Sequence, residues 1–211
     1  MSRSNITKGD LYDISHLIMY NYESLQTFFK KGYSLSNEKF DELMAKKDAI
    51  PKEKLEYDFF EFLSFDKLFI ISSVIIIHSN FEVLLKKICE KCFESKGKNF
   101  SSPHNNIIET CKIKLDSELN LISSESELRW SKIRAYTKVR NSIVHNNCQI
   151  EKQNDFDIVS ALEHLTVDEN KIISKIEPEY IKNKLNDCCD ILLFYNNKII
   201  SWFQKINKFN H

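Results

Sequence analysis

The stretch Val139–Asn147 reads VRNSIVHNN and lies at the end of a segment whose apolar residues recur with helical spacing. At 100° per residue, one side of this helix carries an apolar stripe of Ile133, Tyr136, Val139, Ile143 and Val144. Another side carries Arg134, Lys138, Asn141 and His145. His145 is therefore expected to face away from the core. Arg140 falls inside the stripe, so its guanidinium must reach the surface along its stem or meet a partner.

The asparagines after His145 predict the end of this helix. Asn146 and Asn147 can adopt the left-handed conformation that closes a helix, which leaves His145 in the last turn. A histidine in that place also compensates the helix dipole, so a purely structural role for His145 stays open.

Composition favours a mostly helical protein. The 211 residues include only 3 Gly and 3 Pro, against usual shares of about 7% and 5%. The 30 basic and 30 acidic side chains cancel, so no global field draws the protein to nucleic acid or to an anionic membrane. Any nucleic-acid site must be local.

Helical periodicity recurs along the chain, and Gly32 and Pro51 are expected to end the first two helices. The predicted helices span residues 10–31, 36–50, 52–95, 103–115, 124–145 and 178–206. A break in the third, near Phe65 and Asp66, is left open. Two short β-type runs around a polar turn, LTVDENKII at Leu165–Ile173, predict a hairpin before the last helix.

These patterns predict an all-α fold, a helical bundle with a small β-hairpin before the C-terminal helix. Residues 1–50 are expected to form an N-terminal helical extension, and residues 51–211 the bundle domain. The first residues lack an apolar signal core, and the apolar run Leu68–Ile77 is about half the ~20 residues that a membrane span needs. We therefore expect a cytoplasmic protein with six reduced cysteines and no membrane contact.

Three of the four arginines, Arg129, Arg134 and Arg140, fall within one short segment. In a chain that otherwise uses lysine, arginine persists where a planar fork holds a phosphate or a carboxylate. Tolerance of a half-buried helix face explains the cluster equally well, so both readings stay open.

The motif KVRNSIVHNN (Lys138–Asn147) resembles that of the HEPN (higher eukaryotes and prokaryotes nucleotide-binding) superfamily, an arginine followed by four to six residues and a histidine. The stretch SSVIIIHSNFEVLLKKICEK is similar to an earlier helix of these proteins, which often carries an aromatic residue followed by Glu, here Phe81 and Glu82. The hairpin and the last helix are similar to the tail of one prokaryotic subgroup. The resemblance covers about residues 66–209.

The resemblance implies a HEPN-like bundle that dimerises so that two motifs face each other across one cleft. Many relatives are metal-independent endoribonucleases of toxin, antiphage or RNA-processing systems. The implied catalytic residues are Arg140 and His145, supported by Asn141, Glu82 and Arg134, with no metal and no cofactor. The implied partners are an RNA substrate, a second copy of the chain, and a cognate antitoxin or defence-system protein.

Two other function classes remain open: a HEPN dimer that only binds RNA or a partner protein, and an unrelated helical interaction protein with a coincidental motif. A zinc site is a further alternative, because Cys89 and Cys92 form a CxxC and His145 and Cys148 an HxxC. Both pairs lie on or beside predicted helices, with no turn to gather them. In HEPN toxins modified by nucleotidyltransferase antitoxins a Tyr often follows the His by two residues, and here that place is Asn147.

Overall fold

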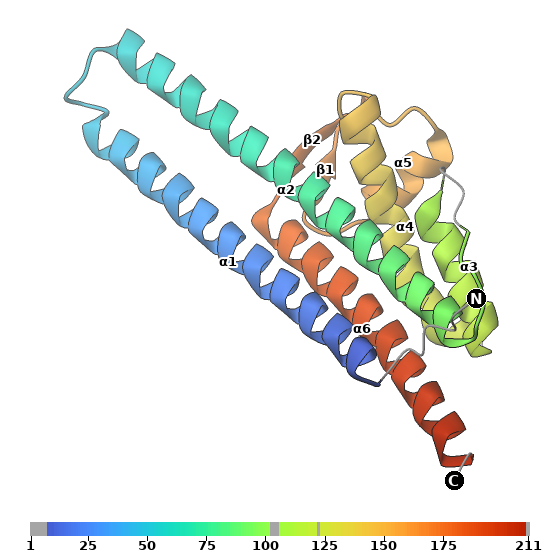
Figure 1. The fold of residues 1–211 in the computed structure, drawn as a ribbon. Coiled ribbons are helices and arrows are strands. Elements are labelled where there is room, and N and C mark those ends of the chain that lie inside the picture. Colours follow the sequence, from blue (N-terminus) through green and yellow to red (C-terminus); the bar gives the residue numbers. More distant parts are fainter. Residues whose placement is uncertain (1–7, 102–105, 122, 210–211) are drawn as a thin grey trace. The chain divides into compact units, whose positions relative to one another are not determined.

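The computed structural model describes residues 8–101, 106–121 and 123–209 (Figure 1). The elements in chain order are α1 (Lys8–Lys46), α2 (Lys52–Ser95), α3 (Ile107–Leu119), α4 (Ser123–His145), α5 (Gln153–Ser160), β1 (Leu165–Val167), β2 (Ile173–Ile176) and α6 (Pro178–Phe209). The prediction of a mostly helical protein with a two-stranded hairpin before the last helix is confirmed. Helix α5 was not predicted. Helix α3 ends at Leu119, later than expected, and its predicted start at residues 103–105 lies outside the described residues.

The chain folds into two compact units, each built from separate stretches of sequence. The first, the core unit, contains the chain up to Tyr22, Ile77–Thr137 and the chain from Lys184. The second, the hairpin unit, contains Glu23–Ile76 and Lys138–Asn183. The two units are described separately below.

Large aromatic side chains fill the core unit and satisfy one another's polar groups. Trp130 and Tyr195 are fully buried. The indole Nε1 of Trp130 donates to the Tyr195 hydroxyl at 2.9 Å, and that hydroxyl donates to the Asp116 carboxylate at 2.6 Å. Because a buried N–H or O–H without a partner costs free energy, this chain of hydrogen bonds lets two large rings fill the core at little polar cost.

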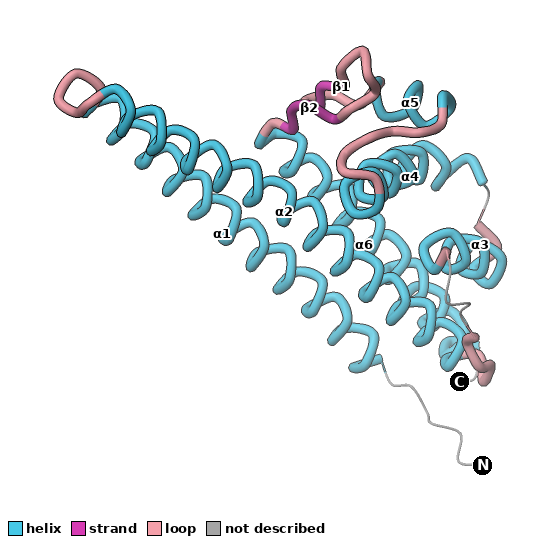
Figure 2. The backbone as a smooth tube through the Cα atoms, turned by 90° about the horizontal axis from the view of Figure 1, so that it is seen from above, coloured by secondary structure: helices cyan, strands magenta, loops and turns pink. Residues whose placement is uncertain are grey.

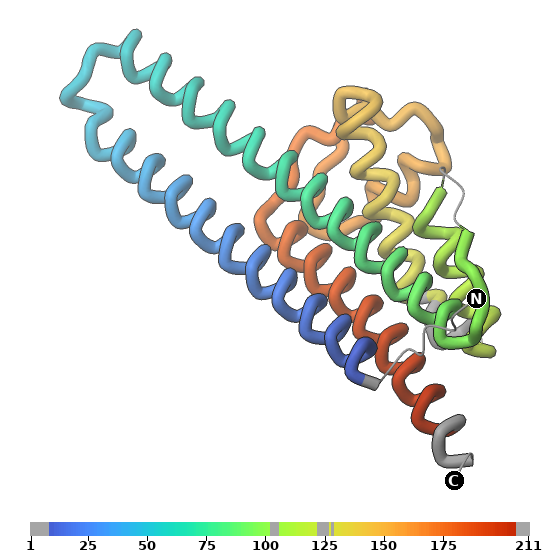
Figure 3. The backbone as a smooth tube through the Cα atoms, viewed as in Figure 1, coloured from blue at the N-terminus to red at the C-terminus, as the bar shows by residue number. Residues whose placement is uncertain are grey.

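The start of α1 packs against α6 in the core unit, where the blue and red ends of the tube lie side by side (Figure 3). The side-chain amide of Asn196, which is fully buried, donates to the Leu11 carbonyl at 3.1 Å and to the Ser15 hydroxyl at 2.6 Å. These bonds fix the register of the first helix on the last.

In the hairpin unit, α1 from Glu23 and α2 up to Ile76 lie side by side in opposite directions (Figure 2). Aromatic rings make the contact, mostly edge-on or tilted, in arrangements that ring quadrupoles favour. One cluster contains Phe28, Phe29, Tyr33, Phe65 and Phe69, and a second contains Phe40, Phe59 and Phe62.

The prediction that Gly32 ends the first helix is wrong. Helix α1 continues to Lys46, so residues 36–46 of the predicted second helix belong to it, and residues 47–50 form the turn that follows. A Cβ at Gly32 would overlap the ring tip of Phe69. The missing side chain therefore makes room for a ring on α2 and does not mark a turn.

Helix α2 has no break near Phe65 and Asp66. The Asp66 carboxylate instead accepts a hydrogen bond of 2.8 Å from the buried Ser36 hydroxyl of α1. Within the described residues α2 is also the one helix long and apolar enough to cross a membrane. The sequence interpretation counted only Leu68–Ile77, whereas the apolar window covers 18 residues. A core helix of a soluble protein passes the same test.

The β-hairpin pairs Leu165 with Ile176 and Val167 with Ile173, with a bulge between Thr166 and Val167. The Asp168 side chain closes the turn by accepting from the backbone N–H groups of Asn170 and Ile172, at 3.0 and 2.8 Å.

We predict that Gly32→Ala destabilises the protein by about 1–3 kcal/mol, the usual range for overpacking. Gly to Ala inside a helix ordinarily stabilises by about 0.5–1 kcal/mol, so the sign of the effect tests the contact with Phe69. Urea denaturation followed by circular dichroism measures it. In a Phe69→Leu background the same substitution should cost less, because the shorter side chain leaves room for the Cβ. Stabilisation by Gly32→Ala alone would contradict the packing argument.

Candidate functional site

The helix that carries the candidate motif ends at His145, as predicted. The backbone N–H groups of Asn146 and Cys148 both donate to the Ser142 carbonyl, at 3.1 and 2.9 Å. Asn147 and Cys148 adopt left-handed conformations, with φ of 49° and 69°. This closure satisfies a carbonyl of the last turn and places His145 at the rim of the helix.

The segment after the motif is tied to the β-hairpin. The Ile173 N–H donates to the Cys148 carbonyl at 2.9 Å, and the Ile150 N–H donates to the Lys171 carbonyl at 2.8 Å. These bonds connect the end of α4 to the hairpin within the hairpin unit. The hairpin therefore helps to position His145, which the sequence did not indicate.

The predicted apolar stripe is correct in four of its five positions. Ile133, Tyr136, Val139 and Ile143 are buried, but Val144 is 42% exposed. The packed side includes Ser142, which is buried and donates to the Lys138 carbonyl at 3.0 Å. Near the end of the helix the buried side therefore includes Ser142 and no longer includes Val144.

The three arginines of α4 have different surroundings. Arg129 lies over the Phe194 ring, 5.7 Å from its centroid. Arg134 donates to both carboxylate oxygens of Glu109, at 3.1 and 2.8 Å, and also to Glu127. The Glu109 and Glu127 hydrogen bonds raise the pKa of Arg134 still further. Arg134 therefore has a structural ion-pair role, and its guanidinium is occupied.

Arg140 forms no salt bridge with any residue that the structure describes. Its Nη1 donates to the Asn141 side-chain oxygen at 2.9 Å, and its Nε is buried without a hydrogen-bond partner in the described structure. A neutral amide does not cancel a positive charge. The Nη1 contact is exposed to solvent, so the guanidinium is accessible and can pair with an anion that binds there.

His145 is exposed, and its ring makes no hydrogen bond to a described residue. Asn141 precedes it by one helical turn, so their side chains are neighbours on the helix surface. The hydrogen bond to Asn141 draws the Arg140 guanidinium towards the side of α4 on which His145 lies. Arg140, Asn141 and His145 thus all lie in the last two turns of α4, where Arg140 and Asn141 are joined by a hydrogen bond.

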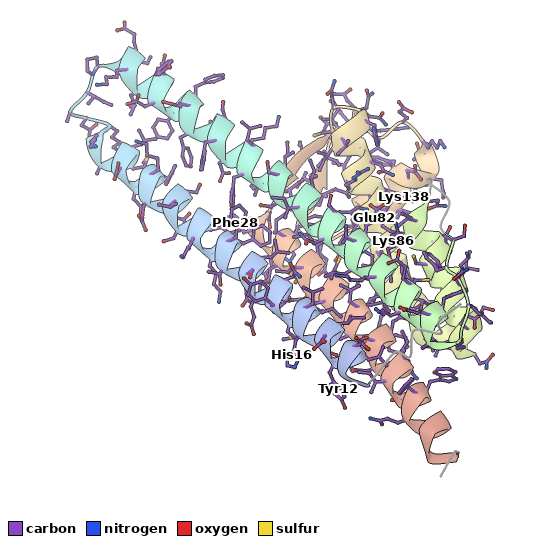
Figure 4. The ribbon with its side chains drawn as sticks, in the orientation of Figure 1. Tyr12, His16, Phe28, Glu82, Lys86 and Lys138 are labelled. Atoms are coloured by element: carbon purple, nitrogen blue, oxygen red, sulfur yellow. The ribbon has the colours of Figure 1, made fainter. Side chains whose placement is uncertain are left out.

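Glu82 and Arg134, the other predicted supporting residues, belong to the core unit, whereas Arg140, Asn141 and His145 belong to the hairpin unit. Glu82 is half-buried in α2, one turn before Lys86 (Figure 4).

Sequence patterns did not indicate Lys138 as an anchor beside the site. Lys138 forms an ion pair with Asp155 and so holds the first turn of α5 against α4. The signal available in the sequence was weak, because Asp155 stands in a segment without clear periodicity.

A pocket of about 760 Å³ in the hairpin unit was also missed. It lies between the α1–α2 arms and the β2–α6 connection, and Cys148 lines it together with Tyr33, Phe62 and Ile176. The Tyr33 hydroxyl is buried without a hydrogen-bond partner in the described part of the chain. Its lining residues come from segments far apart in the sequence, so no local pattern could reveal it.

The four residues of the zinc alternative do not form one cluster. No group of three or more His, Cys, Asp or Glu placed to hold a metal ion occurs in the part of the chain that the structure describes. Cys89 and Cys92 are in the core unit, whereas His145 and Cys148 are in the hairpin unit. Burial raises the pKa of Cys92 to about 11, which disfavours the thiolate that zinc needs.

Comparisons of this chain with models of protein families, with curated proteins and with solved structures found no match. The functional argument therefore depends on the residues and on their geometry.

We predict that Glu127 stabilises the fold above its ordinary pKa range and not below it. The Arg134 hydrogen bond lowers the pKa of Glu127 from 4.5, and Lys112 adds to this effect. A lowered pKa in the folded state means that the stabilisation is present above about pH 4.5 and is lost as the pH falls through the folded value. Melting temperatures of the wild type and Glu127→Gln should therefore differ at pH 7 and converge at pH 3. Glu163→Gln, at an exposed glutamate that takes part in none of the ion pairs described above, is the matched control and should show no such pH dependence.

Proposed function

We propose that the protein is a metal-independent endoribonuclease in which Arg140 and His145 are catalytic. One observation carries the proposal: Arg140 has no carboxylate partner among the described residues, and the exposed His145 stands five residues further along the same helix, in its last turn. The other two arginines of α4 are engaged, one with an aromatic ring and one with two carboxylates.

Arg140 supplies charge stabilisation. A guanidinium presents planar donors that match phosphate oxygens, and charge builds on those oxygens during phosphoryl transfer. A partly buried guanidinium acts in a lower dielectric than water, which strengthens this interaction. Asn141 keeps the guanidinium on the His145 side and can bind a phosphate oxygen once the arginine moves to the substrate.

His145 supplies proton transfer. Imidazole titrates near neutrality, so it can take a proton from the ribose 2′-OH or give one to the leaving 5′-oxygen. One histidine cannot do both in a single step. A homodimer in which two motifs face one cleft provides an acid, a base and two guanidinium groups.

The biological setting that we propose follows the HEPN resemblance: a cytoplasmic toxin or antiphage defence protein that cleaves RNA and is held in check by an antitoxin or another defence-system protein. Glu82 is proposed as a supporting residue on the same basis. The structure gives no contact that assigns it a role, and Arg134 is better explained by its ion pairs.

A HEPN dimer that binds RNA or a partner protein without cleaving it is the second candidate. The zero net charge of the chain favours it, because strong nonspecific RNA binding usually needs a basic surface. Cleavage by the wild type that is lost in the His145 variant below separates the two candidates.

We predict that His145→Ala and Arg140→Ala each reduce RNA cleavage at least 100-fold, the lower end of what one acid–base group contributes. Arg140→Lys should also be poor, because an ammonium cannot reproduce a two-pronged contact with phosphate. A fluorescent RNA cleavage assay measures the rates. Circular dichroism should stay unchanged for His145→Ala, because that side chain is exposed.

The matched controls are His164→Ala and Arg129→Ala. His164 is an exposed histidine of the same unit that bonds to Glu177 at 3.2 Å, and Arg129 is an exposed arginine of the same helix. Both control proteins should retain wild-type cleavage. Full activity in His145→Ala or Arg140→Lys would contradict the proposed catalytic role of the replaced residue.

We predict that cleavage persists in EDTA and leaves a 2′,3′-cyclic phosphate. If two histidines move the protons and two arginines hold the charge, no divalent ion is required for either task. The ribose 2′-OH is then the nucleophile, so DNA and RNA with a 2′-deoxy substitution at the cut should be spared. Mass spectrometry of the products distinguishes the end groups. Activity that disappears in EDTA and returns with Mg²⁺ or Zn²⁺ would contradict this mechanism.

A further inference from the structure

The pocket of the hairpin unit borders one edge of strand β2. Every residue of the strand, Ile173–Ile176, lines this pocket. A strand that turned one face to a cavity would contribute alternate residues only, because successive side chains point to opposite faces. The unbroken run therefore indicates that the pocket runs along an edge of the strand. Since β1 occupies one edge of β2, the pocket borders the other, which we call the outer edge.

The main-chain groups of Ile176 point to this outer edge. The Glu177 N–H donates to the His164 carbonyl at 2.9 Å, and Leu165 pairs with Ile176. Hydrogen-bonded and non-hydrogen-bonded pairs alternate along an antiparallel ladder. The pair of Leu165 and Ile176 is therefore non-hydrogen-bonded, so the N–H and C=O of Ile176 point away from β1. Neither group has a hydrogen-bond partner among the residues that the structure describes.

A short stretch of the chain fills the other half of the outer edge. Residues 148–150 pair with residues 171–173 in an antiparallel arrangement. This pairing ends at Cys148, because Asn147 adopts a left-handed conformation, with φ of 49°, and the chain turns there into the end of α4. The third strand position of the sheet is thus occupied along one half of β2 and open beside Ile176.

We propose that this open half and the pocket beside it, together called the β2 edge site, bind an extended apolar peptide segment of another protein. The segment adds a strand to β2, and one of its residues exchanges both main-chain hydrogen bonds with Ile176. An unpaired strand edge is a template for pairing with an extended chain. The site does not depend on whether the protein cleaves RNA.

The pocket offers room and an apolar wall for the side chains of such a segment. Its volume of about 760 Å³ lies within the range of about 300–1,000 Å³ that is usual for ligand pockets. The apolar residues of the wall come from α1 and α2: Phe40, Phe62, Leu63, Ile70 and Ile71. Side chains of an extended peptide alternate between two sides. Large apolar residues at every second position can therefore enter the pocket.

The charges of the lining favour a segment without strong charge. The charged lining residues are Asp66, Lys67, Lys175, Glu177 and Glu179. Glu177 pairs with Lys175 at 2.9 Å, and Glu179 pairs at 2.8 Å with a lysine outside the lining. The remaining two, Asp66 and Lys67, have opposite signs. A polyanion such as RNA gains little at this place, because its binding depends on a surplus of positive charge.

Selection of peptides tests the β2 edge site. A phage library of random heptapeptides is selected on the immobilised full chain, and the affinities of the enriched peptides are measured by fluorescence anisotropy. These peptides should carry large apolar residues at alternate positions. Leu63→Glu should weaken their binding at least tenfold, because it places a carboxylate in an apolar contact.

Leu68→Glu is the matched control for this substitution. Leu63 and Leu68 lie on the same helix and are 60% and 64% exposed, but of the two only Leu63 lines the pocket. Leu68→Glu should therefore bind the peptides as the wild type does. Circular dichroism should be unchanged in both variants, since the replaced side chains are exposed.

Methylation of the peptide main chain tests the strand pairing without changing the protein. Each N–H of an enriched peptide is replaced in turn by an N-methyl group. At one position the replacement should weaken binding at least tenfold, because it removes the donor to the Ile176 carbonyl and puts a methyl group into the ladder.

Amide hydrogen exchange of the chain labelled with ¹⁵N-isoleucine tests the open half directly. In the free protein the Ile173 amide, which donates to the Cys148 carbonyl, should exchange at least tenfold more slowly than the Ile176 amide. An enriched peptide should slow exchange at Ile176 at least tenfold and leave Ile173 nearly unchanged.

No enrichment of peptides, full binding by Leu63→Glu, or unchanged exchange at Ile176 would each overturn the proposal. Binding that tolerates every N-methyl group would also overturn it, in favour of a pocket for a small apolar ligand. Slower exchange at Ile176 when the chain alone is concentrated from about 20 to about 500 µM would overturn it in favour of a second copy. An inactive protein that binds the peptides as expected would contradict the proposed nuclease and support the β2 edge site.

Discussion

The hydrogen bond from Trp130 to Tyr195 holds α4 in the core unit. The motif residues Arg140, Asn141 and His145 lie on the same helix, so their placement depends on it. The polar groups in this part of α4 are satisfied: the Trp130 indole by Tyr195 and the Arg134 guanidinium by two glutamates. At the other end, in the hairpin unit, the Arg140 guanidinium finds only a neutral amide. Near Trp130 the polar groups of α4 thus have partners. At the other end of the helix Arg140 can still pair with an added anion.

Local periodicity predicted much of the fold because helices and hairpins are determined by neighbours in sequence. The predicted hairpin lies between the motif and the last helix, and His145 ends α4 as its flanking asparagines indicated. The prediction that Gly32 ends the first helix was wrong for a physical reason. It used the conformational freedom of glycine, whereas the actual role of Gly32 is to make room for Phe69, a residue distant in sequence. No pattern within the first helix contains that contact.

The candidate site was predictable to a similar degree. The exposure of His145 followed from helical geometry alone. The difference between Arg134 and Arg140 did not, because it depends on whether a carboxylate lies nearby in space. Glu109, which accepts hydrogen bonds from Arg134, lies on α3. The sequence alone does not indicate which arginine of α4 pairs with this glutamate. Composition therefore identified an arginine cluster, and only tertiary contacts identified the member with charge to spare.

A single copy of the motif offers one imidazole and one uncompensated guanidinium, which is an incomplete acid–base site. If cleavage requires two motifs, the active species is the dimer, and the fraction of dimer follows mass action. Below the dissociation constant the dimer concentration rises with the square of the chain concentration, so the proposed nuclease stays nearly silent at low copy number without any inhibitor. A protein that covers the surface used for self-association would silence it at high copy number as well. Regulation of this kind requires no contact with Arg140 and His145, the proposed catalytic residues, so it places no demand on their chemistry.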